Sequence, residues 1–184
     1  MCIRDRIILG SIPLVIVGYI FYSTNLIDQF RNLKVVAWTT LIFGILLYFS
    51  DKFELKNKIS SELNIKSIII IGLFQILAII PGVSRSGIVI TASRFLKFDR
   101  VESSKIAFYL SIPALAGASV LGFKDVIDDQ INFDAIFIFS TSASFLFSYF
   151  TIKYFLIYVK MFSLSFFVIY RIVLSIILFS IIYL

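Results

Sequence analysis

The chain has little charge, a single cysteine and no histidine. Only 15% of its 184 residues are Asp, Glu, Lys or Arg, whereas 60% are hydrophobic and the mean hydropathy is +1.01. Soluble domains carry about 25% charged residues, so this composition excludes an ordinary soluble domain and predicts an integral membrane protein. Cys2 has no second cysteine to pair with, which excludes an internal disulfide bond.

Basic residues exceed acidic ones, and the formal net charge is +6. The basic residues are scattered through the short segments between apolar runs, which argues against a nucleic-acid binder. Many of the 21 Phe and 9 Tyr residues stand near the ends of apolar runs, where aromatic rings settle at the level of lipid headgroups. Both features fit a chain that crosses a bilayer several times.

Runs of about 20 apolar residues are long enough to cross a bilayer as helices. The sequence contains several such runs, together with a longer apolar stretch, Ser67–Leu96, that is interrupted near its middle. The chain is therefore expected to be an all-α, polytopic membrane helix bundle that forms a single transmembrane domain over residues 7–184. The predicted spans are Ile7–Ser23, Val35–Ser50, Ile106–Phe123, Ala135–Ile152 and Ser163–Leu184.

The N-terminus has the outline of a signal peptide, because the charged residues of Met1–Arg6 precede an apolar run. No small-residue cleavage site follows that run. We therefore interpret Ile7–Ser23 as a retained span.

The distribution of Lys and Arg indicates how the interrupted stretch lies in the membrane. If the stretch enters and leaves on the cytoplasmic side, eleven basic residues fall inside and three outside, as the positive-inside rule requires. If it crosses as one helix, the count becomes seven against seven. The sequence therefore predicts a re-entrant helical hairpin over about residues 67–97. The three outside residues are Arg31, Lys34 and Lys124.

The tip of this predicted hairpin is the segment Pro81–Gly87, which reads PGVSRSG. Pro81 disfavours helix in the residue before it, so Ile80 is expected to end the first half-helix. Gly82 and Gly87 permit backbone angles that other residues resist. Non-helical backbone at membrane depth has to be surrounded by protein or line a watery cavity, so a cavity at the tip is implied.

An arginine inside this apolar stretch predicts a functional site. A charged side chain at bilayer depth costs about 2.5–3.5 kcal/mol on insertion scales, so it usually faces a polar cavity. The second half-helix would direct unpaired amides at an anion, which Arg85 and the hydroxyl groups of Ser84 and Ser86 would also bind. A phosphate is the expected anion, although transporters use the same geometry. The alternative is that Arg85 only pairs with a carboxylate between helices.

Other polar residues are expected to have smaller roles. Gln75 and Ser111 are candidates for the wall of the cavity. Arg94 and Arg171 are interpreted as side chains that reach water at a membrane face and have no function. Glu102 stands near a helix start, where an acid commonly interacts with the helix dipole.

Three segments resemble the undecaprenyl-diphosphatase family, the bacitracin-resistance type of integral membrane phosphatase. They are Gln75–Gly87 (QILAIIPGVSRSG), Arg100–Gly117 (RVESSKIAFYLSIPALAG) and Tyr170–Ile172 (YRI). The first is similar to the family's second signature motif, and the order and spacing of the three also agree. The resemblance covers the C-terminal part of a family member only.

This resemblance implies the second half of an inverted-repeat fold, in which each repeat carries a re-entrant hairpin, in the bacterial inner (plasma) membrane. The enzyme would remove the terminal phosphate of undecaprenyl diphosphate, giving the monophosphate carrier reused in peptidoglycan synthesis. Arg85, Ser84 and Ser86 would be catalytic residues that grip the diphosphate. A divalent cation, Mg²⁺ or Ca²⁺, would assist, and the sequence leaves open whether two copies form a homodimer. The substrate-binding residues would be Gly82, Gly87, Gln75 and Ser111.

The chain also departs from the family. The family's other repeat supplies an acidic stretch and a hairpin that ends in Gly-His, but this sequence has no histidine. Its glutamates all lie in or beside predicted cytoplasmic loops, so no metal ligand, nucleophile or general base is identified. The 184 residues are expected to be inactive alone and to regain activity when the missing hairpin is added. Residues 1–6 are interpreted as extraneous. The glutamates are Glu54, Glu62 and Glu102.

Two other classes of function stay open from the sequence. An anion or lipid-phosphate transporter, or a flippase, would use the hairpin to bind its cargo without hydrolysis, which the lack of a general base allows. An inert partner subunit would bind no phosphate at all.

Overall fold

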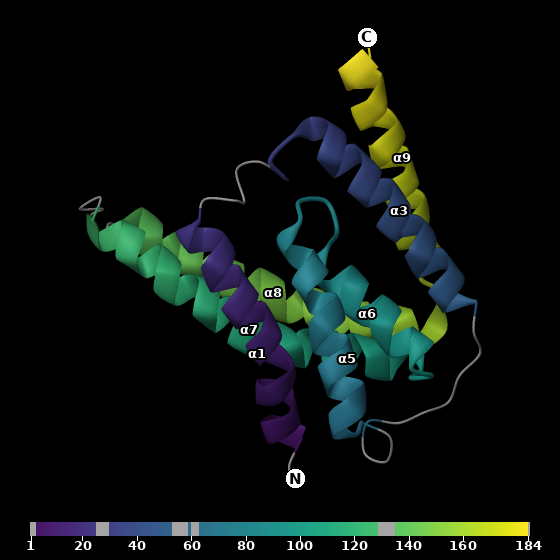
Figure 1. Ribbon diagram of the computed structural model, residues 1–184, viewed down its shortest axis with the longest axis horizontal. Helices are drawn as coiled ribbons and strands as arrows, with labels where there is room; N and C mark the ends of the chain where they lie inside the picture. Colours follow the sequence, from purple (N-terminus) through teal and green to yellow (C-terminus); the bar gives the residue numbers. More distant parts are fainter. Residues whose placement is uncertain (1–2, 25–29, 53–58, 60–62, 129–134, 184) are drawn as a thin grey trace.

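The computed structural model describes residues 3–24, 30–52, 59, 63–128 and 135–183, and for residues 121 and 123–128 it describes the backbone alone. Helices make up nearly all of the described residues, which include no strand (Figure 1). A short 3-10 helix, η1 (Leu77–Ile79), follows the third α-helix. The α-helices are α1 (Ile3–Ser23), α3 (Leu33–Asp51), α5 (Ile65–Ile76), α6 (Arg85–Phe95), α7 (Arg100–Asp128), α8 (Ala135–Met161) and α9 (Ser165–Tyr183).

Four of the predicted spans each fall within one long helix, and the fifth, Ser163–Leu184, begins two residues before α9. Four helices among the described residues, α1, α3, α8 and α9, are long and apolar enough to cross a membrane. The remaining predicted span, residues 106–123, lies within α7. The expected all-α, polytopic membrane bundle is therefore confirmed. Glu54 and Glu62 lie outside the described residues.

The interrupted stretch is a helical hairpin with a broken tip. The first arm, α5 followed by η1, ends at Ile80, whose ψ of 126° is extended. The chain turns at Gly82, which has a φ of +90°, and the second arm, α6, begins at Arg85. The two arms pack against each other (Figure 1). The predicted end of the first half-helix at Ile80 is confirmed, whereas the membrane side from which the hairpin enters stays a prediction.

This hairpin forms the centre of the bundle. Helix α1 packs against α5 and α7, while α6 contacts both α3 and α7, and α3 runs along α9 (Figure 1). The arms bring Ile68, Ile71 and Ile88 into the core, where each is 1% exposed or less. Gly10 and Gly72 permit the close approach of α1 and α5, because a Cβ at Gly72 would overlap the carbonyl oxygen of Gly10.

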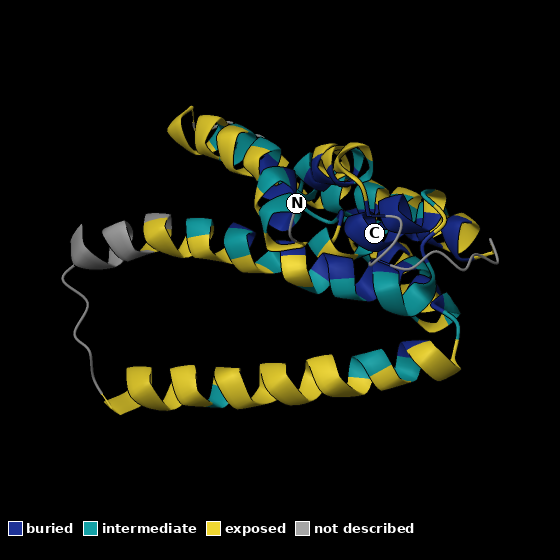
Figure 2. Ribbon diagram, turned by 90° about the horizontal axis from the view of Figure 1, so that it is seen from below, coloured by how far each residue is buried: buried dark blue, intermediate teal, exposed yellow. Residues whose placement is uncertain are grey.

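Helix α8 contributes little to the core. Figure 2 shows it set apart from most of the bundle and exposed along most of its length. Large apolar side chains such as Ile136 and Phe139 are more than 70% exposed, and only the C-terminal end of the helix carries a buried residue, Val159. A helix that is apolar on all sides suits contact with lipid chains.

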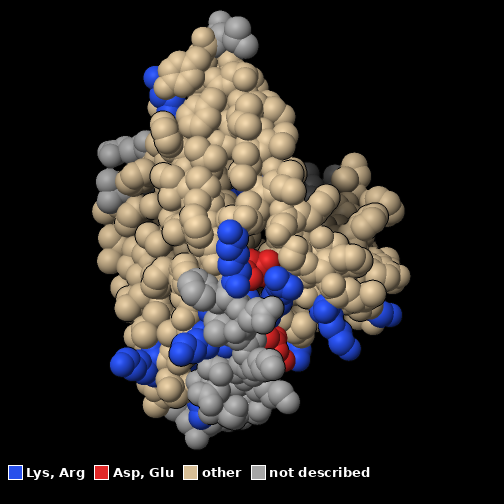
Figure 3. Space-filling model, turned by 90° about the vertical axis from the view of Figure 1, so that its right-hand side faces the viewer, with Lys and Arg blue, Asp and Glu red and all other residues tan. Residues whose placement is uncertain are grey.

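Charged side chains gather towards one end of the bundle. Figure 3 shows Lys and Arg mainly over the lower part of the face at which α3 ends. Asp51, the last residue of α3, is buried there and binds Arg100 bidentately, with distances of 2.6 Å from Nε to Oδ1 and 3.1 Å from Nη2 to Oδ2. Asp51 Oδ2 also accepts the backbone N–H of Leu164 at 3.0 Å. This one carboxylate therefore joins α3, α7 and the turn before α9.

Arg94 belongs to the same cluster, and the prediction that it reaches water is wrong. It is 3% exposed and donates to the backbone carbonyls of Asp51 and Phe98, each at 3.1 Å. The end of α3 and the start of α7 cover the last turn of α6, so protein groups replace water around this guanidinium. Glu102 accepts a hydrogen bond from Lys105 at 2.7 Å, which raises the pKa of Lys105.

Candidate functional site

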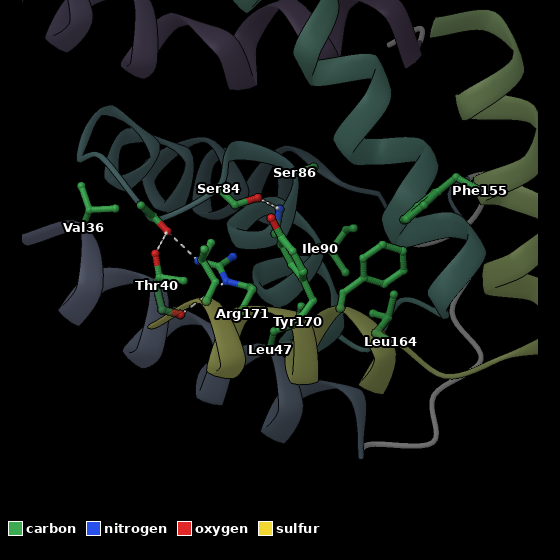
Figure 4. Close-up of a pocket in the computed structure, with 14 residues that line it drawn as sticks. Val36, Thr40, Leu47, Ser84, Ser86, Ile90, Phe155, Leu164, Tyr170 and Arg171 are labelled. Atoms are coloured by element: carbon green, nitrogen blue, oxygen red, sulfur yellow. Dashed lines mark hydrogen bonds between the residues drawn. The ribbon is translucent and has the colours of Figure 1, made fainter. Parts of the chain in front are cut away.

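A pocket of about 490 Å³ lies beside the hairpin tip and is lined by residues of α3, α6, α8 and α9 (Figure 4). This volume is in the range of small-molecule sites, about 300–1,000 Å³. The side chains that line it include no Asp or Glu from the described residues. Its polar groups lie next to the tip and form what we call the polar corner: Thr40, Ser84, Ser86, Tyr170 and Arg171, with the backbone at Gly82 and Gly87.

Arg171 supplies the positive charge of the polar corner, and the prediction that it reaches water at a membrane face is wrong. It is 7% exposed. Its Nη2 donates to the carbonyl oxygens of Gly82 at 2.6 Å and Val83 at 3.0 Å, and its Nε donates to that of Thr40 at 3.4 Å. Carbonyl groups of the hairpin tip and of α3 thus hold the guanidinium inside the protein, away from a membrane surface. These bonds also fix its orientation.

The polar corner favours an anion. A Cβ added at Gly87 would lie 3.0 Å from Arg171 Nη1, so the guanidinium rests against the first turn of α6. The N-terminus of a helix carries unpaired N–H groups and the positive end of the dipole. No carboxylate of the described residues pairs with Arg171, and its Nη1 donates no hydrogen bond to them. The Arg171 guanidinium and the N-terminus of α6 are therefore two positive groups next to one space, and a phosphate bound there would neutralise them.

Ser84, the N-cap residue of α6, has a strained backbone conformation. Its φ of 69° and ψ of 112° are rarely adopted by residues other than glycine. Its Oγ accepts the N–H of Gly87 at 3.3 Å, which caps the helix. At the hairpin tip, the hydroxyl of Thr39 in α3 donates to the carbonyl of Pro81 at 2.7 Å. The surrounding contacts thus hold a conformation that the local sequence alone disfavours.

The structure brings only some of the predicted site residues to this pocket. Gly82, Ser84, Ser86 and Gly87 line it, whereas Arg85 does not. Arg85 is half-buried at the start of α6, and its side chain makes no hydrogen bond or ion pair with another described residue. Successive helical residues point about 100° apart, so neighbours in one turn face different sides. The predicted catalytic roles of Arg85, Ser84 and Ser86 stay predictions.

Gln75 and Ser111 also lie outside the pocket lining. Gln75 is fully buried in α5, and neither its Oε1 nor its Nε2 has a hydrogen-bond partner among the described residues. Ser111 donates to the carbonyl of Phe108 at 2.6 Å within α7. Their predicted part in substrate binding, like that of Gly82 and Gly87, stays a prediction.

Sequence reasoning missed Arg171, Tyr170 and Thr40 as residues of the pocket. Arg171 stands inside an apolar run, as Arg85 does, so the rule that singled out Arg85 applied to it equally. The Thr39-Thr40 pair within a predicted span was a second signal, because hydroxyl groups in membrane helices commonly bond to neighbouring segments. Tyr170 gave no signal beyond its place next to Arg171.

The pocket residues do not fit a divalent cation. No group of three or more His, Cys, Asp or Glu side chains that could hold a metal ion occurs among the described residues. The polar corner offers hydroxyl groups and a guanidinium, whereas Mg²⁺ and Ca²⁺ prefer carboxylate and carbonyl oxygens. The predicted cation therefore stays a prediction, and no step of the chemistry below depends on it.

Gly82→Ala is expected to lower the free energy of unfolding by more than about 2 kcal/mol, because φ is positive and the new Cβ meets neighbouring atoms. That Cβ would lie 2.8 Å from the carbonyl oxygen of Val36 and would overlap the Thr39 hydroxyl. Thermal unfolding in detergent measures the loss. The matched control is Gly18→Ala in α1, where no atom lies within 4 Å of the added Cβ. Equal unfolding temperatures for the two variants would contradict the close contact at the tip.

The fold and pocket together define a class: an all-α integral membrane protein whose broken hairpin meets a buried arginine in a pocket suited to an anion. Residues 2–177 match the family described as "Bacitracin resistance protein BacA". The chain belongs to this family, which confirms the family resemblance noted in the sequence.

Relatives named undecaprenyl-diphosphatase extend along nearly all of the chain. The Pelagibacter ubique (strain HTCC1062) protein is 59% identical over 178 residues, which cover 96% of this chain and 70% of that relative. The Elusimicrobium minutum (strain Pei191) protein is 42% identical, with 94% of this chain and 65% of the relative covered. The Thermobifida fusca (strain YX) protein is 34% identical, with 96% and 60% covered. The chain thus spans about two thirds of the length of these relatives.

Proposed function

We propose that the chain binds the diphosphate group of undecaprenyl diphosphate in the bacterial inner membrane, as part of an undecaprenyl-diphosphatase. The reaction would give undecaprenyl phosphate, the lipid carrier of peptidoglycan synthesis, and phosphate. The observation that carries the proposal is a buried guanidinium without a carboxylate partner among the described residues, set against the N-terminus of α6 in an otherwise apolar pocket. The names of the relatives support the same substrate.

In this proposal the pocket stabilises charge. Phosphoryl transfer from a diphosphate breaks the bond between the terminal phosphorus and the bridging oxygen while water adds to that phosphorus. Negative charge grows on the bridging and terminal oxygens, so donors that are already fixed in place stabilise the transition state. Arg171 is such a donor, as are the N–H groups at the start of α6 other than that of Gly87, which Ser84 Oγ caps, and the hydroxyls of Ser84 and Ser86 can join them.

The chemistry also needs a group that activates water. The described lining of the pocket contains hydroxyl groups and one guanidinium but no carboxylate or imidazole. We therefore assign binding and charge stabilisation to these residues and assign no general base to them.

Hydrolysis of labelled undecaprenyl diphosphate in vesicles tests the proposal. The 184 residues alone are compared with the same residues joined to the N-terminal part of the Pelagibacter ubique relative. We expect inorganic phosphate to appear only with the joined chain, and Arg85→Ala to slow its release about 10²-fold if Arg85 is catalytic. Arg4→Ala, whose side chain is 82% exposed, is the matched arginine control.

One result would contradict this proposal, and a second would revise only the role of Arg85. Movement of the labelled lipid across the vesicle membrane without release of phosphate would favour a transporter or flippase. Full activity of the Arg85→Ala variant would remove Arg85 from the catalytic residues while leaving the pocket around Arg171 to be tested separately.

A further inference from the structure

The wall of the pocket beyond the polar corner is entirely apolar. Along α3, Thr40 lies at the polar corner, and Leu47 lines the pocket seven residues later, a rise of about 10 Å at 1.5 Å per residue. Along α6, Ile90 follows Gly87 by three residues in the same direction. The pocket is therefore elongated, and an apolar wall runs from the polar corner towards the C-terminal end of α3. The apolar wall is completed by Phe155, Leu164 and Phe167, whereas Val36 and Leu174 line the pocket on the other side of the polar corner.

Two aromatic rings of this wall are held by neighbours from other helices. The ring centroids of Phe155 in α8 and Phe167 in α9 are 5.4 Å apart. Phe155 also meets Phe108 of α7 edge to face, at 5.6 Å. These contacts lie in the C-terminal part of α8, which also carries the buried Val159, so this end of α8 closes one side of the pocket. Both rings are half-buried and so present a surface to the pocket.

We propose that this apolar wall binds the isoprenoid units next to the phosphates, and that Phe155 and Phe167 select lipid diphosphates over inorganic ones. The inference rests on the proposed function. An inorganic anion would occupy only the polar corner and leave the apolar wall against water, which is unfavourable. A lipid diphosphate would place its phosphates in the polar corner and its first isoprenoid units against the apolar wall. A pocket of about 490 Å³ holds the headgroup and the nearest part of the chain, and the rest of a long prenyl chain lies in the bilayer.

The test compares two ligands that share a diphosphate. Binding of farnesyl diphosphate and of inorganic pyrophosphate to the detergent-solubilised chain is measured by calorimetric titration. We expect the wild type to bind farnesyl diphosphate at least about ten-fold more tightly, since a single methylene in an apolar pocket changes affinity about 10–200-fold. In Phe167→Ala this preference should fall to about two-fold or less, with pyrophosphate binding unchanged.

The neighbouring residue offers a matched control. Phe166 is 64% exposed and does not line the pocket, so Phe166→Ala should keep the full preference. If Phe167→Ala elutes as an aggregate, Phe167→Leu replaces it, and a reduced preference with intact pyrophosphate binding is again the supporting result.

The failures of the two proposals are distinguishable. If the folded wild type binds neither ligand, the proposed function fails, and this inference fails with it. If the wild type binds both ligands equally, or if Phe167→Ala weakens both to the same extent, the diphosphate site stands and the apolar subsite is overturned.

Discussion

Replacing Arg171 by alanine is expected to weaken the binding of inorganic pyrophosphate by up to about 10²-fold, because a hydrogen bond to a charged group contributes about 1.5–3 kcal/mol. The guanidinium is the only charged group in the described lining of the pocket, and its Nη1 has no protein partner there. The alanine variant loses that charge and the bonds to the Gly82 and Val83 carbonyls, of which the Gly82 carbonyl keeps the Thr40 hydroxyl as a donor at 3.3 Å. Calorimetric titration measures the affinity, and thermal unfolding in detergent measures the accompanying loss of stability.

Arg171→Lys separates charge from geometry. An ammonium keeps the positive charge but cannot donate in a planar fork to two carbonyls and an anion together, so we expect an intermediate loss of about ten-fold. Arg4→Ala, far more exposed, should bind pyrophosphate as the wild type does. Unchanged affinity in Arg171→Ala, with the loss appearing in Arg85→Ala instead, would transfer the anion site to Arg85.

Asp51→Asn is expected to lower the free energy of unfolding by about 3–5 kcal/mol, because it removes the buried carboxylate that lies against the buried Arg94 and binds the partly exposed Arg100. The Asp51 carboxylate is 5% exposed, binds Arg100 at 2.6 Å and lies 3.9 Å from Arg94. Asparagine has nearly the same shape, so the variant removes the charge with little change in packing. Denaturant unfolding of the detergent-solubilised protein measures the difference.

The matched control for Asp51→Asn is Asp5→Asn in α1. Asp5 has a side chain that is 41% exposed and lies 3.7 Å from the exposed Arg4. Surface pairs of this kind contribute about 0–1 kcal/mol, so this variant should unfold nearly as the wild type does. Similar losses in both variants would show that Asp51 does not organise a buried charge cluster. A larger loss at Asp51 would confirm that it joins α3, α7 and the turn before α9.

Local features were readable from the sequence because each depends on a few neighbouring residues. The lengths of the apolar runs predicted the long helices, and Pro81 with Gly82 predicted where the hairpin breaks. The polar residues at the tip identified the segment that lines the pocket, and Ser84, Ser86, Gly82 and Gly87 do reach it. None of these inferences needed the position of another helix.

The sequence by itself determined a polytopic helical membrane protein with a broken hairpin and a cationic tip, since hydropathy, helix breaking and capping act over short distances. Only the tertiary structure decided which guanidinium enters the pocket. Arg171 reaches it because α9 packs along α3 beside the tip, where carbonyls of Thr40, Gly82 and Val83 point at the side chain. Arg94 is buried because Asp51 arrives from a distant part of the chain. The direction of a charged side chain depends on how helices rotate and cross, and no single apolar run contains that information.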